Sequence, residues 1–340
     1  MTPNHAESPV DVTIVVPLYN GGRFIGETLR SVLQQTFSRF EVIVVDDGSN
    51  DEGPDVVQAH RSDARVQLMR NPHLGVAEAR NTGAARASER SRYLMFLDAD
   101  DLWYPETLAT LVDALDRRPD AAGAFVLAEY IDGAGDVLHP GDFPRHMRGR
   151  EDLRGGRFVP RDSAADLLLE HLFLSNLVYP PGCLLMRRAA YETAGGFDGR
   201  YLAEDWEFVM RLAELGPLVP IDRVLAGYRQ HGANASRNRE RNVRGARQVW
   251  ATVYHAAHRS DGTRTRIRAI WRAHQARTAR RKLAEARALV ARGKLLSGMW
   301  RAADGLAHTL LRHPPRVWMA QGEKTRQVES RVAALSRPAD

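Results

Sequence analysis

Cysteine and long apolar runs are scarce in this 340-residue sequence. Cys183 is the single cysteine, so an internal disulfide or a thiolate cluster for zinc or iron–sulfur is excluded, and a reducing compartment is expected. No apolar run reaches the ~18 residues that a membrane-spanning helix needs, and the N-terminus lacks the basic-then-apolar pattern of a signal peptide. We therefore expect a soluble protein that is at most peripheral to a membrane.

Charge is divided unevenly along the chain. Residues 1–235 contain 24 basic and 35 acidic residues, whereas residues 236–340 contain 24 basic and seven acidic ones. Lysine is absent before Lys282, and arginine supplies 21 of the 24 cations in the second segment. This division predicts an acidic body with a basic appendage. Those arginines are spread through helices without a recognised binding motif, so no nucleic-acid partner is expected.

Strand and helix patterns alternate over the first 104 residues. The β-branched run Val10–Val16 predicts a buried strand that ends at Pro17. Further strands are predicted at 40–45, 66–69 and 93–97, with helices at 24–33, 55–60 and 76–87. This order is typical of a parallel α/β sheet. Residues 105–235 predict helices at 105–115, 164–173 and 205–215 with strands at 123–130 and 182–187. An Arg/Ala-rich helical periodicity follows.

Polar side chains follow three of the predicted strands, at Pro17–Tyr19, Asp46–Asp47 and Asp98–Asp101. Ligands of open α/β sheets bind beyond the carboxyl ends of the strands, so one site should collect all three segments. Three carboxylates within four residues repel one another unless a cation or a helix N-terminus compensates, and hard oxygen ligands suit Mg²⁺ or Mn²⁺. The alternatives are that Asp101 caps the next helix and that Asp46–Ser49 is an Asx turn.

Six short segments resemble, in order and spacing, the family 2 glycosyltransferases with the GT-A fold. They are 15–20, 44–49, 79–83, 96–101, 195–198 and 204–206. The resemblance covers about residues 10–235. It implies an α/β, GT-A Rossmann-like, mostly parallel sheet flanked by helices, with an additional α-helical C-terminal region. The expected division is a polar leader (1–9), a GT-A domain (10–235) and a basic helical region (236–340). Within the domain, residues 10–104 would form the nucleotide-sugar half and 105–235 the acceptor-side half.

The resemblance also implies a role for each matching residue. Asp205 is expected to be the catalytic base. Nucleotide binding is expected from Pro17, Tyr19, Asp46, Asp47, Arg80 and Asp98. Mn²⁺ or Mg²⁺ would be held by Asp98, Asp100 and His231. The acceptor and diphosphate side would comprise Gly196, Phe197, Asp198, Glu204, Trp206 and Arg229.

The implied function is inverting, metal-dependent transfer of a sugar from a nucleotide-diphosphate donor, with UDP favoured, to a saccharide or lipid-linked acceptor. Bacterial surface polysaccharide or glycoconjugate synthesis is the implied setting, in the cytoplasm or at the inner face of the membrane. The basic segment could pack on the acidic body, contact anionic lipid or mediate oligomerisation. Residues 139–161 match no family motif and are expected to be an acceptor-specific insertion or lid.

Two other functions predict different sequence features. A sugar nucleotidyltransferase-like enzyme would carry a Gly-rich, Lys-containing phosphate loop after the first strand, but residues 17–20 read Pro-Leu-Tyr-Asn. A non-catalytic scaffold that used the basic tail would have no need of Asp47, Asp98, Asp100 and Asp205 together. The glycosyltransferase hypothesis accounts for both observations.

Overall fold

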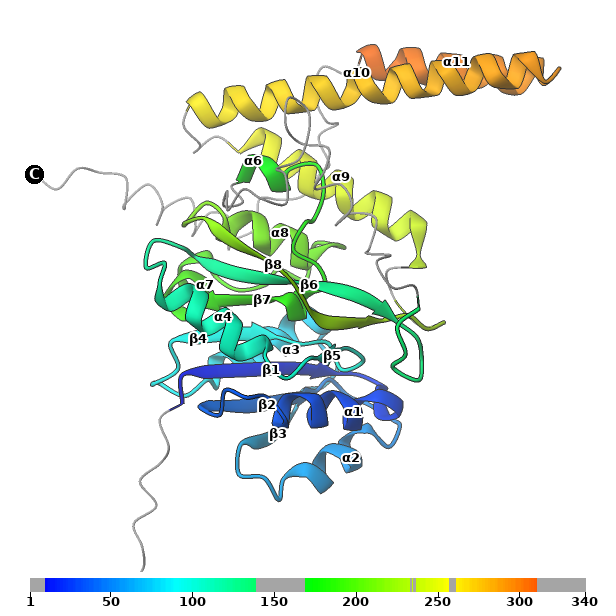
Figure 1. Cartoon of the computed structure of the whole chain (residues 1–340). Helices are drawn as coiled ribbons and strands as arrows, with labels where there is room; N and C mark the ends of the chain where they lie inside the picture. Colours follow the sequence, from blue (N-terminus) through cyan, green and yellow to red (C-terminus); the bar gives the residue numbers. More distant parts are fainter. Residues whose placement is uncertain (1–9, 139–168, 233, 235–236, 257–260, 311–340) are drawn as a thin grey trace, which may run out of the picture.

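A central sheet organises the protein. The computed structural model describes residues 10–138, 169–232, 234, 237–256 and 261–310, and within them the sheet has eight strands in the order β3-β2-β1-β4-β7-β6-β8-β5 (Figure 1). The strands are β1 (Val12–Leu18), β2 (Phe40–Asp46), β3 (Val66–Arg70), β4 (Tyr93–Phe96), β5 (Leu102–Trp103), β6 (Gly123–Ile131), β7 (Leu184–Arg187) and β8 (Leu218–Arg229).

Helices lie on both faces of this sheet, and those nearest the C-terminus pack on other helices. They are α1 (Gly22–Leu33), α2 (Gly53–His60), α3 (Val76–Ala85), α4 (Thr107–Asp116), α6 (Leu169–Leu172), α7 (Arg188–Ala194), α8 (Glu204–Leu212), α9 (Arg239–His255), α10 (Asp261–Ala291) and α11 (Leu295–Leu310). The leader (1–9), the segment 139–161 and the first part of the helix predicted at 164–173 lie outside the described residues.

The α/β prediction is confirmed, although the sheet is more mixed than a doubly wound one. Strands β3, β2, β1 and β4 are parallel, β7 runs antiparallel to β4 and β6, and β8 is parallel to β6. Three elements, β5, α7 and β8, were not predicted from the sequence. The omission of β8 matters most, because this strand carries Arg229 to residues 98–101, which follow β4 and are called the acidic loop below.

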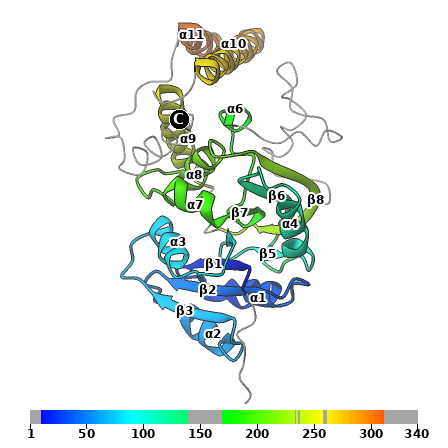
Figure 2. The ribbon, with the colours of Figure 1, turned by 90° about the vertical axis from the view of Figure 1, so that its left-hand side faces the viewer.

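Alternating side chains of the strands fill two cores. Val12, Ile14 and Val16 belong to a core with α1, α2 and α4, whereas Val15 belongs to a core with α3, α7 and α8. Figure 2 shows these two groups of helices on opposite sides of the sheet. A strand buried on both faces has apolar residues at nearly every position, which explains the uninterrupted runs in the sequence.

One boundary differs from the prediction. β1 does not end at Pro17 but continues to Leu18, with Pro17 opposite Val45 of β2. The Val15 carbonyl accepts a hydrogen bond from the Leu97 N–H on the β4 side, and Pro17 faces the same side two residues later. Because β4 ends opposite Val15, no ladder bond is required of Pro17 there.

The C-terminal helices stack above this sheet. Val249 and Val253 of α9 are buried, and Trp271 of α10 contacts the rings of Phe173 and Trp250. α11 then returns along α10 as a hairpin (Figure 1). The described residues include no helix with the length and hydropathy needed to cross a bilayer.

Candidate active site

The carboxyl ends of β1, β2 and β4 meet, as the strand-end pattern predicts. Leu18 of β1 lies opposite Asp46 of β2, and the Asp47 N–H donates 2.7 Å to the Leu18 carbonyl. Tyr19 follows directly and is 53% exposed, with its ring 4.4 Å from that of His73. This end of the sheet therefore presents an open aromatic surface beside two acidic residues.

Both acidic residues after β2 are buried and bonded to backbone. Asp46 accepts the Ser49 N–H at 2.9 Å, which is the Asx turn considered as an alternative. The two carboxylate oxygens of Asp47 accept the N–H groups of Leu74 and Gly75 at 2.8 and 2.7 Å. Asp47 thus fixes the loop that enters α3, and this loop places His73 against Tyr19. Base contacts by Asp46 and Asp47 stay a prediction.

The acidic loop after β4 is held from two other elements. The Thr28 hydroxyl of α1 donates to the carbonyls of Ala99 and Asp101, each at 2.9 Å. Asp101 accepts the Arg229 N–H at 2.9 Å. The alternative that Asp101 caps the next helix is therefore wrong, because α4 begins only at Thr107 and has no side-chain cap. Burial raises the pKa of Asp101 well above its usual value.

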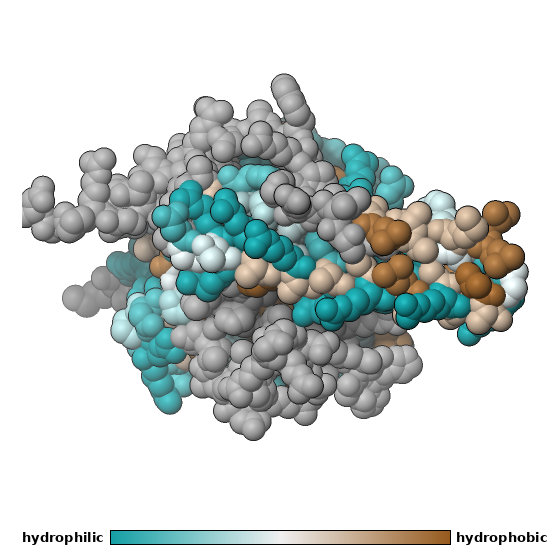
Figure 3. Space-filling model, turned by 90° about the horizontal axis from the view of Figure 1, so that it is seen from above, coloured by the Kyte–Doolittle hydropathy of each residue, from teal (hydrophilic) through white to brown (hydrophobic). Residues whose placement is uncertain are grey.

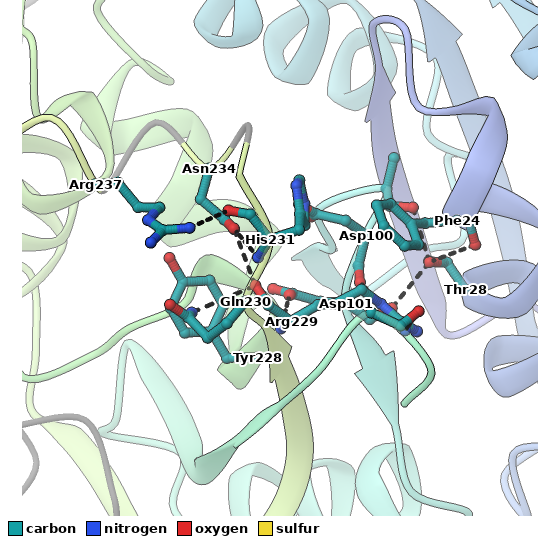
Figure 4. Close-up of polar contacts among 12 residues, drawn as sticks. Phe24, Thr28, Asp100, Asp101, Tyr228, Arg229, Gln230, His231, Asn234 and Arg237 are labelled. Carbon is teal, nitrogen blue, oxygen red and sulfur yellow. Dashed lines mark hydrogen bonds and ion pairs between the residues drawn. The ribbon is translucent and has the colours of Figure 1, made fainter. Parts of the chain in front are cut away.

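Asp100 and His231 form the centre of Figure 4. The His231 Nε2 lies 2.8 Å from the Asp100 carboxylate, and the imidazole ring packs 4.8 Å from Phe24. Burial and then the charge of Asp98 raise the pKa of Asp100, although His231 opposes the shift. A histidine more than 130 positions away in sequence thus meets the acidic loop, as the resemblance implies.

Arg229 holds the backbone of Asp100 in place. Its side chain is fully buried; Nε donates 2.7 Å to the Asp100 carbonyl and a terminal nitrogen donates 2.6 Å to Glu27. The other terminal nitrogen donates to the carbonyls of Asp132 and Gly133. The contact of Arg229 with a diphosphate stays a prediction. This arrangement favours an indirect role, in which Arg229 positions the backbone of Asp100.

Arg80 joins the two halves of the site. This α3 residue is 3% exposed; it contacts Asp98 at 2.7 Å and Glu204 of α8 at 3.1 Å. Burial alone would lower the pKa of Arg80, but the charges of Asp98 and Glu204 outweigh burial and raise the pKa. The guanidinium lies 5.1 Å from the Phe197 ring centre. Its Nε has no hydrogen-bond partner within the described residues.

Asp205 lies in the first turn of α8, next to Glu204. It is half-buried and accepts a hydrogen bond from the Asn176 amide at 3.1 Å. Burial, together with the charge of Glu204, raises the pKa of Asp205 to about 7, while Arg80 acts in the opposite direction. A carboxyl group with such a pKa changes protonation near neutral pH, as a general base must.

The glycine pair before Asp198 forms a tight connection to α3. Gly196 has φ +71°, and a Cβ there would lie 2.6 Å from the Asn81 side-chain oxygen. That oxygen accepts the Phe197 N–H at 2.8 Å, and the Asn81 amide donates to the Phe197 carbonyl. Asp198 binds Arg200, which lowers its pKa despite burial that acts to raise it. The predicted acceptor roles of Gly196, Phe197 and Asp198 stay untested.

Trp206 is buried and donates its indole N–H to the Leu172 carbonyl at 2.9 Å. Its ring also packs against Trp250 of α9, so it anchors α8 on neighbouring elements. Four residues that hold the site together were not predicted from the sequence: Thr28, His73, Asn81 and Asn176. Asn81 could have been suspected from its place beside Arg80 in a matched segment, whereas a lone Thr or His carries no such signal.

The acidic loop and His231 together offer some, but not all, of the ligands that a divalent cation needs. Asp98, Asp100 and His231 offer oxygen and nitrogen atoms, and Asp100 with His231 is within hydrogen-bonding distance. Within the described ranges, no group of three or more His, Cys, Asp or Glu side chains lies close enough to hold a metal by itself. This donor set suits Mg²⁺ or Mn²⁺, which take further ligands from substrate phosphates and water.

The fold is therefore a mixed α/β sheet whose strand ends gather carboxylates around the buried Arg80. Residues 13–195 match the family described as Glycosyl transferase family 2, so the chain belongs to the family 2 glycosyltransferases. An Escherichia coli protein named chondroitin synthase is 25% identical over 66% of this chain and 30% of its own length. The match to an uncharacterised glycosyltransferase of Rickettsia bellii covers 14% of that protein. The chain thus spans less than a third of these curated relatives.

Two solved structures share the fold. S. aureus TarS 1–349 in complex with UDP-GlcNAc has a TM-score of 0.59 at 17% identity, over 96% of this chain and 91% of that one. Mannosyltransferase PcManGT from Pyrobaculum calidifontis, in complex with GDP-Man and Mn²⁺, has a TM-score of 0.58 at 20% identity, over 95% and 86%. The expected GT-A fold and the glycosyltransferase family are confirmed.

Proposed function

We propose that this protein is an inverting, metal-dependent glycosyltransferase that moves a sugar from a nucleotide-diphosphate donor to a hydroxyl of a saccharide or lipid-linked acceptor. The arrangement of Arg80 carries this proposal. Its guanidinium connects Asp98, on the donor side, with Glu204, the neighbour of Asp205 on the acceptor side. The Arg80 cation therefore lies between a donor-side carboxylate and the residue that precedes Asp205.

Asp205 is proposed to be the base of the transfer. Its ionised carboxylate takes the proton of the acceptor hydroxyl while the hydroxyl oxygen attacks the anomeric carbon of the donor sugar. The bond from that carbon to the diphosphate oxygen breaks, and the diphosphate leaves with the electron pair. Attack from the face opposite the leaving group inverts the anomeric centre. The Asn176 amide, hydrogen-bonded to the carboxylate, orients the base.

The donor diphosphate is proposed to lie over the acidic loop. Asp98, Asp100 and His231 would hold Mn²⁺ or Mg²⁺ there, and the bound ion supplies Lewis-acid stabilisation of the charge that develops on the leaving phosphate. Phe24 orients the His231 ring, and Arg229 with Thr28 fixes the backbone that presents Asp100. The position of Asp100 and His231 is therefore preorganised by this chain's own contacts.

The nucleotide base is proposed to bind at the end of β1. Tyr19 and His73 provide ring surfaces, Pro17 lies on β1 two residues before Tyr19, and Asp47 fixes the loop that carries His73. UDP is our proposed nucleotide. A neighbour solved with UDP-GlcNAc and another solved with GDP-Man support a sugar-nucleotide donor of this general kind.

We assign the acceptor to the side formed by 195–206, where the loop at Gly196 and the start of α8 meet. The name of the E. coli relative supports a saccharide acceptor, as in bacterial surface polysaccharide or glycoconjugate synthesis. A lipid-linked acceptor would place the enzyme in the cytoplasm at the inner face of the membrane, with the basic C-terminal region towards anionic lipid.

Thermal stabilisation by nucleotides tests the donor site. UDP, GDP and dTDP are each added with and without Mn²⁺; a ligand at 100 times its dissociation constant should contribute about 2.7 kcal/mol. We expect stabilisation by UDP that requires Mn²⁺ and is retained in Asp205→Asn. If only GDP or only dTDP stabilises the protein, that nucleotide would replace UDP in our proposal. Absence of a shift with all three would refute the donor site.

A further inference from the structure

α11 turns an apolar face outward. Leu295, Leu296, Met299, Trp300 and Leu306 are all exposed, with Leu296 at 84% and Trp300 at 68%. Because successive helical residues are about 100° apart, these five side chains occupy less than half of the helix circumference. Figure 3 shows hydrophobic residues gathered over the projecting end of the α10–α11 hairpin, with hydrophilic residues along its side.

The opposite face of α11 packs on α10 through small and charged residues. A Cβ on Gly298 would lie 2.5 Å from Val290 of α10, so only glycine permits this close approach. Lys282 of α10 pairs with Asp304 at 2.6 Å. Arg301 pairs with Glu285 at 2.7 Å. A helix of a globular protein ordinarily buries its apolar side, and here the polar side is the one that packs.

The hairpin is also strongly basic. Residues 261–310 contain 12 basic and three acidic residues. Each of the three acids already has a basic partner, in the pairs Asp261–Arg264, Glu285–Arg301 and Asp304–Lys282. The hairpin that bears the apolar face of α11 therefore has a large excess of positive charge.

We propose that α11 docks this protein on an anionic phospholipid bilayer. Its apolar face enters the boundary between headgroups and acyl chains, and the surrounding arginines and lysines contact lipid phosphates. An amphipathic helix with Trp and Leu on one side and cations on the other has the chemistry that such an interface selects. A second copy would oppose the same positive charge, and a nucleic acid would leave the Leu and Trp side chains unused.

Cosedimentation of the full chain with lipid vesicles tests this docking. We expect binding to vesicles of phosphatidylcholine with phosphatidylglycerol, weaker binding to phosphatidylcholine alone, and loss of binding at high salt. The double substitution Leu296→Gln with Trp300→Gln should lower partitioning at least tenfold, or about 1.4 kcal/mol. Both side chains are exposed, so circular dichroism should show an unchanged fold. The matched control is Val243→Gln, an exposed apolar position on α9, which should keep wild-type partitioning.

Brominated lipid locates the contact. It should quench tryptophan fluorescence of the wild type, and Trp300→Phe should remove most of that quenching. Equal partitioning of the double variant and the wild type would overturn the proposal. So would a wild-type dimer that the double substitution converts to a monomer, with no vesicle binding by either protein. These measurements need no sugar transfer, so their outcome is independent of the proposed function.

Discussion

Replacement of Asp205 by Asn should have opposite effects on two quantities. It should increase the free energy of unfolding near neutral pH and lower the rate of sugar transfer. In the folded protein, burial beside Glu204 raises the pKa of Asp205 to about 7, against an ordinary value of 3.8. Between these two values the unfolded chain carries the carboxylate ionised while the folded chain holds it protonated. Wild-type stability contributed by this group is therefore present at low pH and is lost as pH rises towards 7.

The magnitude follows from the shift. One pKa unit corresponds to about 1.4 kcal/mol, so the two units between pH 5 and pH 7 correspond to at most about 3 kcal/mol. The variant has no carboxylate at position 205, so its free energy of unfolding does not fall with pH for this reason. Urea unfolding at pH 5 and pH 8 should show the stability difference between variant and wild type moving in the variant's favour by about 1–3 kcal/mol. The exposed Asp55→Asn is the control and should show no such change.

Activity should change in the opposite direction. Wild-type transfer should rise with pH through about 7, because only the ionised carboxylate accepts the acceptor's proton. Asp205→Asn should reduce transfer by 10²–10⁴-fold, the usual contribution of a general base. The measurements are initial rates of nucleotide-diphosphate release from pH 5.5 to 8.5. A pH-independent stability difference would refute the environment that we assign to Asp205, and a fully active variant would refute its role.

Three further substitutions test the centre of the site. Arg80→Lys keeps the charge but cannot contact both carboxylate partners in the same way, so kcat/KM should fall at least tenfold. An unchanged kcat/KM would exclude a role of Arg80 in transfer. Asp100→Ala should abolish the Mn²⁺-dependent part of the thermal shift with nucleotide diphosphate; an unchanged shift would remove Asp100 from the metal site. Gly196→Ala adds a Cβ at positive φ against Asn81 and should lower the free energy of unfolding by about 1–3 kcal/mol in urea denaturation, whereas Gly199→Ala, where a Cβ makes an ordinary contact, should cost clearly less.

The sequence was sufficient for features that depend on local pattern. Short apolar runs predicted β1, β2 and β4, and the segments at their carboxyl ends, two of them acidic, predicted a site there. It failed for β8, whose apolar positions are interrupted by Pro220, Asp222 and Arg223. The burial of that strand depends on pairing with β6 and β5, which no local period records. Consequently the burial of Arg229 could not be foreseen.

Resemblance supplied candidate residues but not the way in which the structure uses them. Asp46 and Asp47 share one short acidic segment, yet their carboxylates bond to backbone groups of different loops. Asp101 completes an acidic triplet but accepts a hydrogen bond from a strand more than 120 residues later. The outward apolar face of α11 is a similar case, because periodicity identifies the face and only the packing on α10 shows that it points outward.

The acidic loop and the segment that follows β8 form one structural unit. Arg229 holds the Asp100 carbonyl, while His231, two residues later, lies against the Asp100 carboxylate. Asn234 in turn donates to the Arg229 carbonyl and closes a turn over both. A displacement of this segment would therefore move the backbone and the side chain of Asp100 together. Since Arg229 is fully buried and also bonded to Glu27 of α1, the acidic loop is tied to both α1 and β8. This gives a physical reason why the arrangement of the acidic loop needs residues as far along the chain as Arg229 and His231.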